Sequence, residues 1–121
     1  MGYDDGNSFD LKKSMAVVGN NKTVFVKLLK TYAASTLMGE LLNALEEGDN
    51  GLAKDKAHAL KGVSGNMRFD EVFDLVKNIE ADMKEGKPVT INDASVINLQ
   101  AAHARALAAI NRYIDNPGLL S

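Results

Sequence analysis

Residues 57–67 read AHALKGVSGNM, and this stretch predicts both a helix and the way in which that helix packs. At about 100° per residue, Leu60, Val63 and Met67 lie roughly 140–200° away from His58, on the opposite side of the helix. Four residues lie within about 60° of His58 on its own side: Lys54, Lys61, Gly62 and Gly65. We therefore expect the helix to bury its bulky side and to present one imidazole to solvent, beside lysines and glycines.

The apolar residues elsewhere in the chain also recur at every third or fourth position, which is the period of an amphipathic helix. A short first helix is expected over residues 9–18, with Ser8 as its N-cap and Gly19 as its stop. The apolar positions of residues 24–45 fit either one bent helix or two helices that meet near residues 35–36.

Three further helices follow from the same pattern. Residues 48–50 are expected to end the helical stretch 24–45 and to cap the helix that carries His58. Asp70 is expected to cap the helix that follows, and this helix ends near Lys84. The last begins near residues 92–93 and is broken at residues 116–118. Alternating strand patterns are missing, because the short stretch 88–91 is the sole candidate.

These elements predict an all-α fold. Short connections favour antiparallel packing of neighbouring helices, so we expect an antiparallel up-and-down four-helix bundle with an additional short N-terminal helix. The bundle domain is assigned to residues 8–115, with a flexible N-terminal segment over residues 1–7 and a C-terminal tail over residues 116–121.

Composition excludes several classes of function. With 14 basic and 16 acidic residues the net charge is −2, and no basic run occurs, so nucleic-acid binding is not expected. The absence of cysteine rules out disulfides, thiol catalysis and a cysteine-based zinc site. Apolar runs are soon interrupted by charge and the N-terminus is acidic, so we expect a cytoplasmic protein without membrane association. A monomer is expected, because one accessible histidine per bundle needs no symmetric partner.

The exposed histidine has a chemical use if it carries phosphate. Imidazole has an unperturbed pKa of about 6.5 and is therefore a competent nucleophile near neutral pH. A phosphoryl group brings a charge of about −2, which lysines one turn away would stabilise. Two glycines on the same face cost roughly 1 kcal/mol each relative to alanine, and they remove bulk that would obstruct another protein. The alternative is an ordinary surface histidine, which leaves both glycines without a reason.

The stretch around His58 resembles the signature of a known family. Six residues resemble the signature of histidine-phosphotransfer (HPt) domains: His58, Leu60, Lys61, Gly62, Ser64 and Asn66. The flanking runs over residues 41–49 and 75–80 resemble the family as well, and the likeness covers about residues 10–85. It implies a phosphorelay intermediate, in which His58 accepts a phosphoryl group from the aspartyl-phosphate of one receiver domain and donates it to another.

The resemblance also implies roles for neighbouring residues. Lys61 matches the basic residue that steadies the phosphate, and Glu80 falls where the family often has Gln or Glu close to the histidine. A carboxylate there could accept a hydrogen bond from Nδ1–H and leave Nε2 as the nucleophile, although a solvated helix charge is an equal alternative for Glu80. The receiver-binding surface is expected to include Lys54, Gly62, Gly65 and Arg68.

Arg68 departs from the family pattern, which commonly has a small residue at this position. The same angle count places Arg68 beside Lys61, where it would add positive charge for an acidic receiver pocket or narrow the set of partners.

Catalytic machinery of its own is not expected in this chain. Histidine kinases place an acidic residue directly after the active histidine and add an ATP-binding domain, whereas Ala59 follows His58 here and 121 residues leave no room for such a domain. The resemblance implies no cofactor in this chain, with Mg²⁺ bound by the partner receiver. The second hypothesis is a helical adaptor that binds receivers without carrying phosphate.

The second histidine, His103, lies along an apolar face and is expected to make an ordinary hydrogen bond at the edge of the core.

Overall fold

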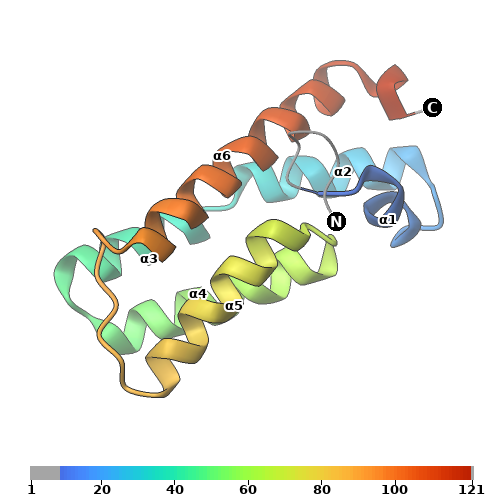
Figure 1. The fold of residues 1–121 in the computed structure, drawn as a ribbon. Coiled ribbons are helices and arrows are strands. Elements are labelled where there is room, and N and C mark those ends of the chain that lie inside the picture. Colours follow the sequence, from blue (N-terminus) through green and yellow to red (C-terminus); the bar gives the residue numbers. More distant parts are fainter. Residues whose placement is uncertain (1–8, 121) are drawn as a thin grey trace.

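The computed structural model describes residues 9–120, and all of its regular elements are helical (Figure 1). They are α1 (Leu11–Ala16), α2 (Lys22–Ala34), α3 (Leu37–Glu47), α4 (Asn50–Asn66), α5 (Asp70–Lys84), α6 (Ala94–Asp115) and the short 3₁₀ helix η1 (Pro117–Leu120). Residues 88–91 form no strand, and none occurs elsewhere in residues 9–120.

Four helical segments close into a bundle. The backbone turns at Ser35, which is extended with ψ 138°, so residues 24–45 form two helices rather than one bent helix. Helix α3 packs against α4, α4 against α5 and α5 against α6, while α2 packs along α6 and completes the ring. Figure 1 shows successive helices running in opposite directions, with α2 and α3 together acting as one bent member. The expected antiparallel up-and-down bundle is confirmed.

The core is built from the apolar stripes of these helices. Every long helix contributes fully or almost fully buried side chains: Phe25, Leu29, Leu41, Leu60, Val72, Val76, Leu99 and Ile110. Alanines at Ala53, Ala57, Ala102 and Ala106 are also buried, and small side chains allow helices to approach closely. Each stripe is continuous at helical spacing, which is why periodicity alone predicted the elements.

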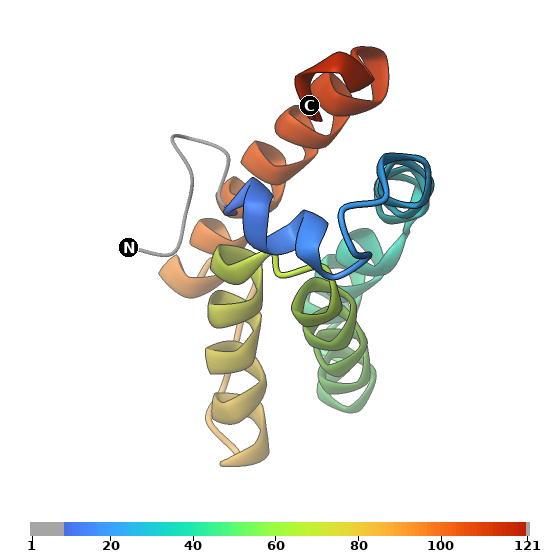
Figure 2. The same cartoon turned by 90° about the vertical axis from the view of Figure 1, so that its right-hand side faces the viewer.

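Helix α1 covers one end of the bundle (Figure 2). The ring of Phe9, just before it, lies 4.5 Å from that of Phe69 in the α4–α5 turn. The buried hydroxyl of Ser14 donates to the Met67 carbonyl oxygen at 2.5 Å. The additional N-terminal helix is therefore tied to the turn that follows the helix carrying His58.

The boundaries of α1 differ from the prediction. Its N-cap is Asp10, whose carboxylate accepts from the backbone N–H groups of Lys12 and Lys13, and Ser8 lies outside the described residues. The helix ends at Ala16, because the chain turns through left-handed conformations at Gly19 and Asn20. The segment assigned to residues 1–7 also lies outside the described residues.

The other termini agree with the sequence to within a residue or two. Asp49 caps α4 by accepting from Leu52 N–H at 3.0 Å. Asp70 lies in the first turn of α5 and makes no capping bond, since Phe69 occupies the N-cap position. Helix α6 ends at Asp115, and the following residues form η1, whose Leu120 is buried. Residues 117–120 therefore pack back onto α2 and α6.

Candidate functional site

The histidine at the centre of the α4 sequence lies on the surface. The side chain of His58 is 68% exposed, whereas Leu60 on the opposite side of α4 is buried. The hydroxyl of the buried Ser64 donates to the Leu60 carbonyl oxygen at 2.8 Å. The hydrogen-bonding requirement of this signature residue is therefore met within α4. The helix divides into a buried and an exposed side as the angles predicted.

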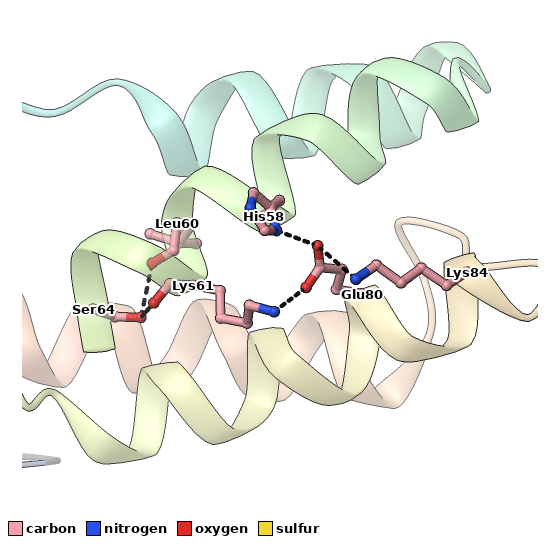
Figure 3. Close-up of polar contacts among 6 residues, drawn as sticks. All are labelled: His58, Leu60, Lys61, Ser64, Glu80 and Lys84. Carbon is pink, nitrogen blue, oxygen red and sulfur yellow. Dashed lines mark hydrogen bonds and ion pairs between the residues drawn. The ribbon is translucent and has the colours of Figure 1, made fainter. Parts of the chain in front are cut away.

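A buried carboxylate holds the exposed ring from the neighbouring helix. Nδ1 of His58 lies 2.7 Å from Oε2 of Glu80 on α5, and the Glu80 side chain is only 3% exposed (Figure 3). Glu80 is therefore not a solvated helix charge. An ionised carboxylate can only accept, so in the neutral ring the proton resides on Nδ1 and the unshared electron pair on Nε2.

Two lysines share the same carboxylate. Nζ of Lys61 lies 2.5 Å from Oε1 of Glu80, and Nζ of Lys84 lies 3.7 Å from Oε2 (Figure 3). Lys61 was predicted to belong to the site. Its ion pair with Glu80 was not predicted. Lys84 was taken only as a helix-end residue; its i,i+4 spacing from Glu80 is the signal that could have identified it.

The ionisation of Glu80 follows from these contacts. Burial by itself raises the pKa of a carboxyl group, but the hydrogen bonds from Lys61 and His58, together with the charges of the two lysines, outweigh it and lower the pKa of Glu80. Glu80 is therefore an anion at neutral pH, and the site contains a negative charge under the imidazole with cations on either side.

The two glycines on this face have different surroundings. A Cβ atom on Gly62 would meet nothing within 4 Å, whereas one on Gly65 would lie 2.9 Å from Cδ1 of Phe73 on α5. The absence of a side chain at Gly65 is therefore explained by helix packing inside the protein. Gly62 has no such explanation and leaves open surface next to His58.

Arg68 lies outside the helix on which its position was calculated. Helix α4 ends at Asn66, and Arg68 adopts a left-handed conformation with φ 59°. The helical angle calculated for Arg68 was therefore wrong, since the helical rotation stops before this residue. The Arg68 side chain instead borders a surface hollow between α4 and α5 that Lys61 and Gly62 also line.

The remaining predicted residues are separated from this cluster or open to solvent. Lys54 is exposed one turn before His58, in a region that Met83 and Pro88 also border. His103 lies on α6, where its Nδ1 is 3.2 Å from the Tyr32 hydroxyl, and burial lowers the pKa of His103. The expected ordinary hydrogen bond of His103 is confirmed.

Residues 9–120 contain no group of three or more histidine, aspartate or glutamate side chains arranged to hold a metal ion. Of the helices in that range, none combines the length and the hydropathy needed to cross a bilayer.

Fold and site together define a small helical bundle organised around one exposed histidine with a buried carboxylate behind it. The Hpt domain family matches residues 33–110, which is more than half of the chain, and the protein therefore belongs to the HPt family. Members of this family are phosphocarriers of two-component signalling that interact with receiver domains.

A solved structure shares the fold. The crystal structure of the HPT domain from the Hpt sensor hybrid histidine kinase from Shewanella matches with a TM-score of 0.81, covering 92% of this chain and 97% of that one. The two sequences are 17% identical, so the likeness extends to the architecture alone. No curated protein matches the chain.

Proposed function

We propose that His58 is the phosphorylated residue, which accepts a phosphoryl group from the aspartyl-phosphate of one receiver domain and donates it to another. The observation that carries this proposal is the geometry of the ring: Nδ1 is occupied by the buried Glu80 at 2.7 Å, while the side chain as a whole is 68% exposed. Nε2 is thus the ring nitrogen left for an incoming phosphoryl group.

The chemical step requires no group beyond those of the two proteins. The electron pair of Nε2 attacks phosphorus, the N–P bond forms, and the P–O bond to the receiver aspartate breaks, with its electrons leaving on the carboxylate. The proton stays on Nδ1, so the phosphorylated ring is cationic, and the Glu80 carboxylate stabilises that charge. Transfer to the second receiver is the reverse of this step.

Lys61 and Lys84 provide positive charge for the phosphoryl group. Both already contact Glu80, and Lys84 is 57% exposed, so its ammonium group can move while Nδ1–H of His58 continues to pair with the buried Glu80 carboxylate. We propose that the phosphoryl oxygens compete with Glu80 for these lysines, because a phosphoryl dianion on His58 attracts a nearby ammonium group strongly. Mg²⁺ and the acidic cluster that assist transfer are assigned to the receiver, and the chain acts as a carrier without a cofactor.

The test is transfer of ³²P from a receiver domain labelled on its aspartate. The wild-type protein should acquire an acid-labile, base-stable label, and the His58→Gln variant should acquire none. The matched control is His103→Gln, since the chain has two histidines and this change removes the other one. Label on His58→Gln would contradict the proposal, and receiver binding without label on either protein would favour the adaptor.

A further inference from the structure

The end of helix α4 has a specific hydrogen-bonded form. The N–H of Phe69 donates to the Ser64 carbonyl oxygen at 2.9 Å and that of Arg68 to the Gly65 carbonyl oxygen at 3.1 Å, which is the Schellman pattern. The residue immediately before Phe69 must then adopt a left-handed conformation, and Arg68 does so with φ 59°. Glycine is the residue that adopts this conformation without steric cost.

The chain itself uses glycine at the equivalent positions after α3 and α5, whereas α2 and α6 end without a left-handed residue. Gly48 after α3 has φ 74° and Gly86 after α5 has φ 77°. The residue following each of them donates to the carbonyl oxygen five positions back, at 2.9 Å in both cases, just as Phe69 does. Of these three helix ends, the end of the helix that carries His58 is therefore the exception, because Arg68 takes the place of glycine.

The fold gains little from the arginine side chain. The closest carboxylate oxygen is Oδ1 of Asp70, 3.6 Å from Nε of Arg68, and Arg68 is 49% exposed. That distance exceeds a hydrogen bond, and an exposed ion pair of this kind contributes little to stability. Among residues 9–120 the guanidinium group makes no hydrogen bond, so its donors remain available to another molecule.

The position of Arg68 connects it to the phosphorylation site. Its side chain borders the open hollow between α4 and α5, whose wall includes Gly62 and Lys61. Gly62 lies one turn from His58 and leaves open space above the helix. A protein that covers His58 and occupies the space above Gly62 would therefore extend over this hollow toward Arg68.

We infer that Arg68 is a specificity-determining residue that binds a carboxylate on the receiver domain, at the edge of the surface that covers His58. This inference rests on the proposed function of His58. Charge complementarity selects the occupant, because an exposed guanidinium group with free donors pairs best with a carboxylate, which it can hold by two parallel hydrogen bonds. The unfavourable backbone conformation is retained because the side chain recognises a partner.

The experiment compares Arg68→Gly and Arg68→Asn with the wild type. Both replacements tolerate the left-handed conformation and remove the charge. We measure the second-order rate constant of ³²P transfer from each receiver domain of the same genome, and also labelling of His58 by phosphoramidate, a small donor that requires no docking. Lys30→Ala on α2 removes a surface cation from a helix that packs on α6, and is the control.

Arg68→Gly should raise the melting temperature and yet slow transfer from the preferred receiver about tenfold, with a weaker dependence on salt, which corresponds to the loss of one charge-assisted contact. Phosphoramidate labelling should stay within about twofold of wild type, as should transfer to Lys30→Ala. Unchanged transfer rates with every receiver that labels the wild type would overturn the inference and leave the proposed function intact. Failure of every receiver to label the wild type would overturn both.

Discussion

The Nδ1 atom of His58 lies 2.7 Å from Oε2 of Glu80, so an exposed ring on α4 is oriented by a buried carboxylate on α5. This contact determines which nitrogen carries the proton. It also places a negative charge where the ring becomes positive during transfer. The properties of the site therefore depend on the register between two helices as much as on the histidine itself.

The protonation state of the ring gives the first prediction. In the wild type at pH 8, long-range ¹H–¹⁵N NMR of His58 should show the proton on Nδ1, because Glu80 is an ionised acceptor. Glu80→Ala should shift the population toward the Nε2–H form and slow transfer by about tenfold or more, as loss of an orienting partner does in comparable sites.

Glu80→Gln is the control for that prediction. Its amide oxygen can still accept from Nδ1–H, so the tautomer should stay as in wild type. A wild-type spectrum with the proton on Nε2 would contradict the role given to Glu80.

Replacing Gly65 and Gly62 by alanine should change the free energy of unfolding in opposite directions. Gly65→Ala places a methyl group 2.9 Å from Phe73 and should lower the free energy of unfolding by about 1–3 kcal/mol, because the ring must shift. Gly62→Ala meets nothing and should raise it by about 1 kcal/mol through helix propensity. Urea denaturation followed by circular dichroism measures both, and equal shifts of the same sign would be inconsistent with this packing.

Acid should lower the free energy of unfolding, in part because it protonates Glu80. The pKa of Glu80 is lowered by Lys61 and His58 from an ordinary value of 4.5, so its contribution to stability is complete above pH 4.5 and is lost as the pH falls through the folded-state pKa. The difference in unfolding free energy between wild type and Glu80→Gln should therefore shrink between pH 6 and pH 3. A difference that stays constant over this range would show that Glu80 is not ionised in the way its contacts imply.

His103 should contribute to the pH dependence of stability at a higher pH than Glu80 does. Burial lowers the pKa of His103 below its ordinary value of 6.5, so the neutral ring stabilises the fold above pH 6.5 and this contribution falls as the pH drops further. Replacing His103 by Gln should flatten the stability profile just below pH 6.5. Thermal unfolding of the two proteins from pH 8 to pH 5 checks this, and parallel profiles would argue against a buried neutral ring.

The helical period predicted the bundle and the exposure of His58, because the angular position of a residue within one helix is a local property. It could not decide whether Glu80 is buried under the ring, since the register between α4 and α5 depends on contacts such as Gly65 with Phe73. It also missed the end of α4 before Arg68, because the left-handed residue that ends a helix is usually signalled by glycine, and here it is an arginine. The sequence contained the residues of the site, while their pairing required three dimensions.

The most direct test of the account is the chemical identity of the phosphohistidine. The protein is labelled by a ³²P-receiver, digested in alkali, and the labelled amino acid is separated against standards of the two isomers. We expect phosphate on Nε2, because Glu80 occupies Nδ1 at 2.7 Å, and no label from His58→Gln. Phosphate on Nδ1, or label that persists in His58→Gln, would contradict the account.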